Sequence, residues 1–142
     1  MPKGFELVLK DSDERKLVLA GYRIIRSREL ITVSRQLLVS GHFKDSINRS
    51  YFAMFSAMRA VLALDGFDAK KHYGVLSEFR KLYIKTDVFP EEYSEFIGDA
   101  FQVRNDSDYD DLFIASEEDA ASQLEHAESL VSAIEEFLTN LT

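Results

Sequence analysis

Arg104 and the side chains that follow it are the part of this sequence best suited to chemistry. Residues 103–109 read VRNDSDY, so Asn105 is adjacent to the arginine, Asp108 stands four positions after it and Tyr109 five. A guanidinium can hold a phosphate or pair with a carboxylate, and a phenol can donate or accept a hydrogen bond. The segment therefore offers two roles, an anion-binding site or a structural ion pair.

Arg104 is also isolated in charge. Residues 87–142 carry 16 acidic side chains and no other lysine or arginine, whereas residues 1–86 carry 16 basic and 9 acidic ones; the formal net charge is −8. An acidic chain is a poor general binder of nucleic acid, because nonspecific affinity comes from clustered basic residues. Solvated helix faces of opposite sign are the simplest interpretation. A local basic patch, or docking of the basic half onto the acidic half of a second copy, stays open.

Length and composition indicate one domain over residues 1–142. A 46% hydrophobic content can fill a single core. The absence of cysteine removes disulfides and thiolate metal sites, and the absence of a Glu-x-x-His pair or glycine-rich phosphate loop predicts neither metal nor cofactor. With no long apolar run and no signal-peptide pattern, we expect a cytoplasmic protein without a membrane segment.

The positions of the few glycines and prolines, and the scarcity of alternating apolar runs, predict an all-α fold. The expected architecture is an up-and-down bundle of about five helices. Gly41 and Gly66 are expected to end the first two helices, and Gly21 leaves open a break inside the first. The five expected ranges are from a cap at Asp11 or Ser12 to Ser40, Lys44 to Asp65, Ala69 or Lys71 to Lys85, Pro90 to a residue within 104–109, and from a cap at Ser116 to Leu141.

Helical periodicity indicates which faces are buried. The second segment has an apolar face that includes Tyr51 and Met58, and its other flank consists of serines and alanines, so we expect it at the centre of the bundle. Seven-residue spacing marks the expected buried face of the first segment: Leu17, Ile24, Ile31 and Leu38.

Arg104 continues the apolar face of the fourth segment. It follows Ile97 by seven positions and Ala100 by four. A guanidinium on such a face must be paired, because an isolated buried charge is too costly to persist. Asp108, at i+4, is the nearest candidate. The structural interpretation is an Arg104 to Asp108 ion pair that holds the end of this helix.

Two segments of the first half resemble the helices of a known family. Residues 41–57, GHFKDSINRSYFAMFSA, include Arg49 and Tyr51 and are similar to the "A-x-x-R-x-Y-Y-A-x-F-x-A" helix of small prokaryotic HEPN domains. Residues 71–75, KHYGV, place His72 where the next helix of that family begins with a histidine.

The second half completes the resemblance. Arg104 with Asp108 and Tyr109 is similar to the "R-x-x-x-D-Y" segment of HEPN domains. The three segments occur in order within the five-helix pattern and together cover roughly residues 22–138. Each segment alone is a weak signal, and the three in sequence are fairly specific.

The resemblance implies a helical bundle that dimerises. Many HEPN domains are metal-independent ribonucleases that use an Arg-x(4 to 6)-His motif at the dimer cleft. Several are toxins neutralised by a small nucleotidyltransferase, and others are non-catalytic or bind nucleotides. Carried over by position, Arg104 would be the motif arginine and Asn105 the polar residue after it, but Tyr109 stands where the family has histidine.

This substitution argues against efficient catalysis. Metal-free cleavage of RNA needs a base for the 2′-hydroxyl proton, and a phenol of ordinary pKa is ionised in only about one molecule per thousand at pH 7. His72 is the best substitute base; His42 has the position of a loop residue, and His126 lies on an expected exposed face of the last helix. We therefore expect a homodimeric partner of a nucleotidyltransferase with a degenerate motif. The alternatives are a ribonuclease toxin using Arg104 with Tyr109 or His72, and a nucleotide-binding module.

Overall fold

The computed structural model of the chain describes residues 4–67 and 72–141, with side chains for 13–67 and 74–141. Over these residues it is an all-α bundle, as the sequence predicts, and contains no strands. Its elements in chain order are α1 (Gly4–Val39), α2 (Phe43–Ala63), α3 (His72–Phe79), the π-helical turn η1 (Arg80–Ile84), α4 (Glu92–Tyr109) and α5 (Glu117–Asn140). None of the helices in the described part has the length and apolarity needed to span a bilayer.

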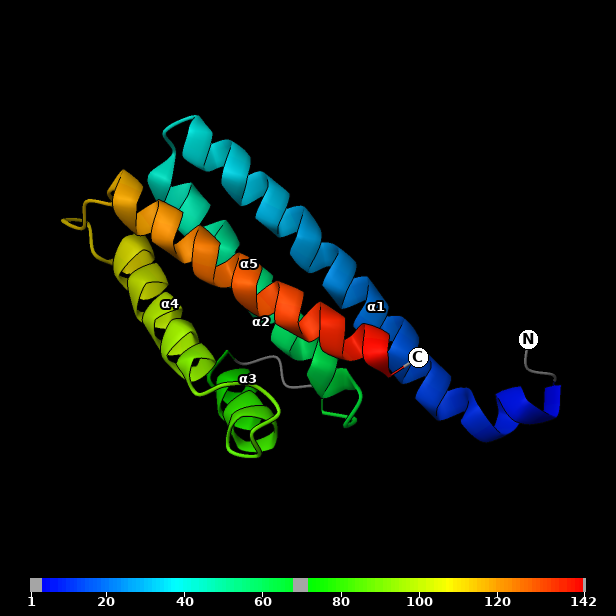
Figure 1. The fold of residues 1–142 in the computed structure, drawn as a ribbon. Helices are drawn as coiled ribbons and strands as arrows, with labels where there is room; N and C mark the ends of the chain where they lie inside the picture. The colour runs from blue at the N-terminus through cyan, green and yellow to red at the C-terminus, as the bar shows by residue number, and fades with distance from the viewer. Residues whose placement is uncertain (1–3, 68–71, 142) are drawn as a thin grey trace.

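The second helix is the centre of the bundle. In Figure 1, α1 runs along one side of α2, α5 crosses in front of it and α4 lies on the other side, with α3 and η1 below. Contacts between elements agree, because α2 packs against α1, α3, α4 and α5. Both of its faces are buried: Tyr51 and Met58 lie on the apolar face, and Ser50 and Ala57 on the small one. The predicted central position is confirmed.

Buried serines hold α1 against α2. The Ser34 hydroxyl lies 2.7 Å from that of Ser50, and Ser46 donates to the Ser34 carbonyl at 3.0 Å. Ser27 donates to the Ala53 carbonyl at 2.9 Å. Small side chains let the two backbones approach closely, and each hydroxyl finds a partner, which removes the cost of burying it. The sequence indicates the small size of these residues but not the hydrogen-bond network.

The first helix is longer than predicted. It begins at Gly4, so the cap expected at Asp11 or Ser12 is wrong, and it runs unbroken through Gly21. Residues that favour caps do not impose them; they are tolerated within a helix whose neighbours keep their backbone hydrogen bonds. Gly41 follows with a φ of 82°, the left-handed conformation expected of a residue that ends a helix.

Of the boundaries predicted for the later helices, some agree with the structure and others do not. Pro90 lies in a turn ahead of α4, where its carbonyl accepts from the Tyr93 amide at 3.1 Å, so the helix begins at Glu92 rather than at the proline. Ser116 caps α5 as predicted, because the Asp119 amide donates to its hydroxyl at 3.0 Å. The start predicted for the third helix falls outside the described residues.

The two middle residues of the predicted α1 face are buried and the two outer ones are not fully so. Ile24 and Ile31 lie in the core, Leu38 is partly buried against it, and Leu17 is 38% exposed. A strict seven-residue repeat drifts by about 20° per heptad on a straight helix, so a residue two heptads from Ile31 has turned away from the partner helix. Leu17 instead faces a groove between α1 and α5.

Candidate functional site

Arg104 lies in the last turns of α4 with only 15% of its side chain exposed. Its Nε is 2.9 Å from Asp108 Oδ2, the pair expected from their i,i+4 spacing. The Nε–H does not point at that oxygen with hydrogen-bond geometry, so the contact is an ion pair. The Nη1 group donates to Asn105 Oδ1 at 3.3 Å. The charge predicted to need a partner therefore has one within its own helix.

Three aromatic rings surround the same guanidinium. The Arg104 Cζ lies 5.4 Å from the Tyr51 ring centroid, 5.2 Å from that of Phe52 and 5.8 Å from that of Tyr109. Cations at such distances are attracted to the negative faces of aromatic rings. We call the six residues that meet here the Arg104 site: Tyr51, Phe52, Arg104, Asn105, Asp108 and Tyr109.

The second helix closes the Arg104 site from the opposite side. Asn48 donates through Nδ2 to Asp108 Oδ2 at 3.4 Å, and Phe52 follows Asn48 by one helical turn. The sequence predicts neither residue as part of the site, although both lie within the segment that resembles the HEPN helix. Their spacing, i and i+4 on the flank next to Tyr51, is the signal that could have identified them.

Tyr51 is an uncharged wall of this site. Burial raises its pKa to about 12, and the nearby Arg104 charge offsets part of that rise. Its ring packs edge-on against Phe52 at 5.3 Å and Phe101 at 6.2 Å between centroids. At neutral pH the phenol therefore keeps its proton and is unsuited to act as a base.

Tyr109 is the exposed part of the site. It is the last residue of α4 and is 75% exposed. After Asp110, the loop before α5 also presents Leu112 and Ile114 to solvent. The end of α4 thus carries a tyrosine and two large aliphatic side chains on one short segment.

Arg49 lies beside the Arg104 site rather than in it. It is exposed and lines a groove of about 380 Å³ between α1 and α2 together with Arg26 and Arg59. Phe52 belongs to both places, because it also lines this groove. The Arg59 Cζ lies 5.9 Å from the ring centroid of Phe55 in the same groove wall. A local basic patch is therefore present in the first half of the chain.

No histidine side chain that the structure describes lies beside Arg104 as a base. The side chain of His72 lies outside them, so its predicted role stays a prediction. His42 lines a shallow hollow with residues 113–115. His126 is half-buried and stacks on Phe96 with centroids 3.9 Å apart, so the expectation that it lies on an exposed face is wrong. The neighbouring helix α4 covers it, which periodicity within α5 does not reveal.

The Arg104 site thus combines one cation, one carboxylate and three rings. Asp108 neutralises the guanidinium, and the rings remove most of it from water, which suits a fixed structural charge better than a free phosphate receptor. Within the described residues, no group of three or more His, Cys, Asp or Glu is arranged to hold a metal ion.

Comparison with known proteins places this arrangement in a family. The family model described as "HEPN domain" matches residues 21–137. A Thermotoga maritima protein named "UPF0332 protein" is 31% identical over 116 residues, which cover 82% of this chain and 88% of that protein. "Putative toxin MJ0142" of Methanocaldococcus jannaschii is 29% identical over 115 residues, which cover 81% of this chain and 78% of that protein. A further protein of that organism, "Putative toxin MJ0605", is 26% identical and covers 81% of this chain. The chain belongs to the HEPN domain family.

Proposed function

We propose that this chain is the HEPN component of a toxin–antitoxin type pair and acts as a homodimeric binding partner of a nucleotidyltransferase. In this proposal the Arg104 site organises a binding surface and does not cleave RNA. The observation that carries it is the enclosure of Arg104: its charge is paired with Asp108 and covered by three rings, and the position of the family histidine is Tyr109. The names of the two archaeal relatives support the toxin–antitoxin context.

The chemistry of the site supports binding over cleavage. Cleavage without a metal requires a base near neutrality and a cation free to hold charge on the phosphorane. Tyr51, the phenol most enclosed by the site, has its pKa raised by burial. The cation is already engaged with Asp108. Catalysis by these groups would require the Tyr51 phenol to lose its proton and the Arg104 guanidinium to leave Asp108.

The surface next to the Arg104 site is suited to a protein partner. Tyr109, Leu112 and Ile114 are large, exposed and close in sequence. Tyrosine is one of the residues that carry much of the binding energy of protein interfaces, and burial of the two aliphatic side chains against a partner adds apolar area. Arg104 and Asp108 fix the end of α4, from which this segment extends. In the proposal, the partner covers the α4–α5 loop.

Co-expression with the product of the adjacent open reading frame tests the proposal. The two proteins should purify as one complex, and Leu112→Asp or Ile114→Asp should release the partner. Leu141→Asp is the matched control, because it places the same charge at another exposed leucine, at the far end of α5. Elution of this chain alone from the co-expressed mixture would count decisively against the proposal.

A ribonuclease toxin is the second candidate, and the basic groove favours it. Arg26, Arg49 and Arg59 line the groove, and Phe52 connects its wall to the Arg104 site. Guanidinium groups beside an aromatic ring are typical of surfaces that bind single-stranded nucleic acid. This candidate predicts growth arrest on expression that Arg104→Ala relieves.

The groove also supports a nucleotide-binding module, because a phosphate and a base would find cations and a ring there. This alternative differs in its test. A nucleotide that binds only the folded chain should raise the melting temperature, and the rise should grow with the logarithm of the nucleotide concentration above its dissociation constant. Arg49→Ala should abolish that rise, whereas an intact rise in the variant would place the nucleotide elsewhere.

A further inference from the structure

The π-helical turn η1 and the end of α3 carry a cluster of cations around a hollow of about 260 Å³. We call it the η1 hollow, and the residues that line it are Ser77, Arg80, Lys81 and Lys85. Among the described residues, no carboxylate forms an ion pair with any of the three cations. The chain has 25 acidic side chains and 17 basic ones, so cations without a carboxylate are unexpected here. We propose that the η1 hollow binds a terminal phosphate group.

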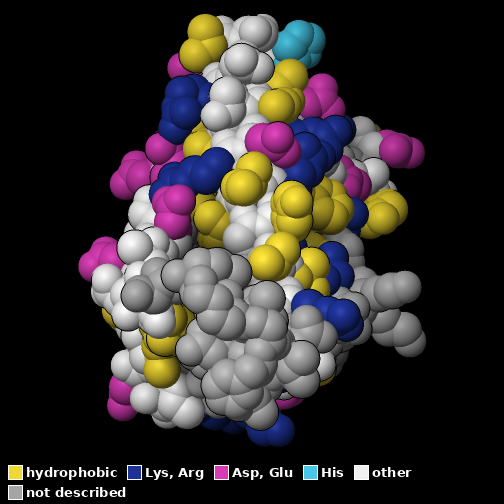
Figure 2. Space-filling view, turned by 90° about the vertical axis from the view of Figure 1, so that its right-hand side faces the viewer, with side chains coloured by type: hydrophobic (Ala, Val, Ile, Leu, Met, Phe, Trp, Pro, Cys, Tyr) yellow, Lys and Arg dark blue, Asp and Glu magenta, His cyan; other side chains and the backbone are white. Residues whose placement is uncertain are grey.

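Basic side chains on another face of the molecule are arranged differently. Figure 2 shows the α1 side, where the side chains of Lys and Arg lie among those of Asp and Glu. Between α1 and α5, Arg28 pairs with Glu135 and Arg35 with Glu128. Pairs of this kind neutralise each charge within the chain. The cations of the η1 hollow lack such partners in the described part of the chain, which leaves them available to an anion from outside.

The π turn brings Arg80 and Lys85 toward the same side of the helix. The Lys85 amide donates to the Arg80 carbonyl, five residues back, at 2.9 Å. In a regular α-helix, residues five apart point about 140° away from each other. The wider turn reduces that angle, and both side chains line the hollow. Turns of this kind are rare overall and frequent at functional sites.

The guanidinium of Arg80 is held in place by α4. Its Nε donates to Ser94 Oγ at 3.0 Å, and its Nη2 donates to the Ser94 carbonyl at 3.1 Å. Its Nη1 has no partner among the described residues. Because the residue that holds it is neutral, the guanidinium keeps its full charge. Its planar set of donors matches the oxygens of a phosphate.

Gly98 makes room for this guanidinium. A Cβ at position 98 would lie 3.0 Å from Arg80 Nη2, so a larger residue here would push the guanidinium aside. Gly98 lies inside α4, where glycine is a poor helix former. The position of Arg80 therefore accounts for a glycine that the helix itself disfavours.

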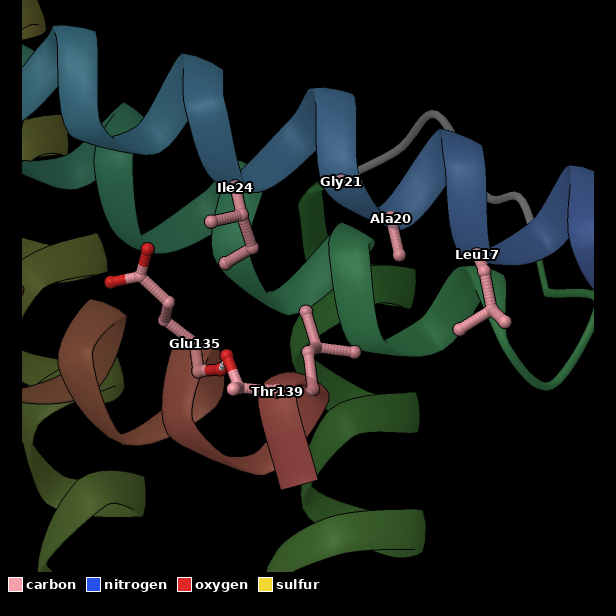
Figure 3. Close-up of a pocket in the computed structure, with 7 residues that line it drawn as sticks. Leu17, Ala20, Gly21, Ile24, Glu135 and Thr139 are labelled. Atoms are coloured by element: carbon pink, nitrogen blue, oxygen red, sulfur yellow. Dashed lines mark hydrogen bonds between the residues drawn. The ribbon is translucent and has the colours of Figure 1, made fainter. Parts of the chain in front are cut away.

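The residues around the η1 hollow distinguish it from the groove between α1 and α5. That groove has a similar volume, about 270 Å³, and its α1 wall consists of Leu17, Ala20 and Ile24 (Figure 3). Its charged residue, Glu135, is already paired with Arg28. An apolar lining suits an apolar group. The hydroxyl and cationic side chains of the η1 hollow suit a small anion instead.

The charge and size of the hollow define the ligand. A terminal phosphate carries about two negative charges at neutral pH, which one guanidinium and two ammonium groups can neutralise. Ser77 adds a hydroxyl that can donate to a phosphate oxygen. The hollow is smaller than the roughly 300 Å³ at which pockets for larger ligands begin, so only the phosphate enters it. Inorganic phosphate, a mononucleotide and the phosphorylated end of an RNA strand share this group.

This inference goes beyond the proposed function and does not rest on it. Ser94, which holds Arg80, precedes Arg104 by ten residues on α4, about 15 Å along the helix. Substitutions in the η1 hollow should therefore leave the Arg104 site intact. Phosphate binding and co-purification with a nucleotidyltransferase give separate answers.

Isothermal titration calorimetry on the full chain tests the inference. The probes are inorganic phosphate, adenosine monophosphate and a 5′-phosphorylated RNA oligonucleotide. Adenosine and the same oligonucleotide with a 5′-hydroxyl are the controls. We expect one site per chain for the phosphorylated probes and an affinity at least about tenfold lower for the controls. The probe that binds most tightly identifies the source of the phosphate.

Variants locate the site. Lys81→Ala and Lys85→Ala should each raise the dissociation constant about tenfold, because each removes a cationic donor. Both positions are exposed, so helical content by circular dichroism should be unchanged. Gly98→Ala keeps every charge but displaces Arg80, and should also weaken binding. Lys44→Ala is the matched control, because it removes an exposed lysine from α2, outside the hollow, and should leave the affinity unchanged.

Three results would overturn the inference. A phosphorylated probe that binds no better than its control would show that the phosphate is not recognised. An equal loss of affinity in Lys44→Ala would reduce the effect to net charge. An affinity that neither Lys81→Ala nor Lys85→Ala lowers would place the phosphate outside the η1 hollow.

Discussion

The Arg104 site differs from the usual distribution of residues in one direction, and the ridge that Val18, Tyr22 and Ile25 form on the outer side of α1 differs in the other. At the Arg104 site a charge stands on a face expected to be apolar, and on the ridge three apolar side chains stand where polar ones are expected. The first departure is resolved within the chain, by Asp108 and the rings of Tyr51, Phe52 and Tyr109. The second has no covering element among the described residues. An internally satisfied site is expected to stabilise the fold, and an uncovered one to bind a partner.

Neighbouring isoleucines on α1 should show the largest contrast. Ile24→Ala should lower the free energy of unfolding by about 3 kcal/mol, because it removes a buried side chain from the core. Ile25→Ala should change it by about 0.5 kcal/mol or less, because that side chain is mostly in solvent. Urea denaturation of dilute, monomeric protein followed by circular dichroism measures both. Equal losses at the two positions would mean that the ridge belongs to the core.

Removal of the Arg104 guanidinium should have the next largest effect. Arg104→Ala should lower the free energy of unfolding by about 2 kcal/mol, because it removes three ring contacts and leaves the partly buried Asp108 without its cation. Arg26→Ala is the matched control: its pair with Glu29 is exposed, and its loss should change stability by about 0.5 kcal/mol or less. An Arg104→Ala variant with the same free energy of unfolding as the unmodified chain would contradict the structural role of this arginine.

Alkaline pH should weaken the Arg104 site through Tyr51. Burial raises the pKa of Tyr51 to about 12 in the folded chain, above the ordinary value of about 10. Its contribution to stability is therefore complete below pH 10 and is lost as pH rises from 10 through 12, because the phenol ionises first in the unfolded chain. Tyr51→Phe should reduce that alkaline loss by an amount on the order of 1 kcal/mol. Urea midpoints measured between pH 8 and 12 report it.

Part of the alkaline loss should persist in the Tyr51→Phe variant. The pKa of Tyr83 is also raised, first by burial and then by its hydrogen bond to Asp65 at 2.7 Å. A further Tyr83→Phe substitution should remove that remaining part. An alkaline profile that Tyr51→Phe leaves unchanged would exclude Tyr51 as its source.

Gly21→Ala should have a small effect of the opposite sign. The monomer should gain about 1 kcal/mol of stability, because alanine is the better helix former and its Cβ meets no neighbour. Thermal melts measure the gain. A lower melting temperature in the variant would mean that the outer side of α1 does not tolerate a methyl group at this position.

Much of the fold follows from the sequence because burial is periodic. Tyr51 and Met58 mark the apolar face of α2 at helical spacing, and Gly41 and Ser116 mark helix ends through local backbone preferences. Each of these signals depends on residues within one or two turns of each other. The starts of α1 and α4 are exceptions: cap preference at Asp11 is weaker than the continuity of the helix, and Pro90 lies in a turn ahead of α4.

The candidate site is less predictable because its parts come from different helices. The Arg104 to Asp108 pair lies within one helix and follows from i,i+4 spacing. The rings of Tyr51 and Phe52, and the Asn48 amide that reaches Asp108, come from α2 and meet α4 only after the bundle packs. The exposure of the α1 ridge is likewise a tertiary fact, since the sequence shows apolar residues on more than one side of that helix.

Incubation of the purified chain with RNA in chelator at neutral pH tests the central claim most directly, that the Arg104 site binds and stabilises but does not cleave. The account predicts that RNA stays intact with the unmodified chain, as it does with Arg104→Ala. Cleavage by the unmodified chain that disappears in an Arg104→Ala variant that circular dichroism shows to be folded would contradict the account and make Arg104 a catalytic residue.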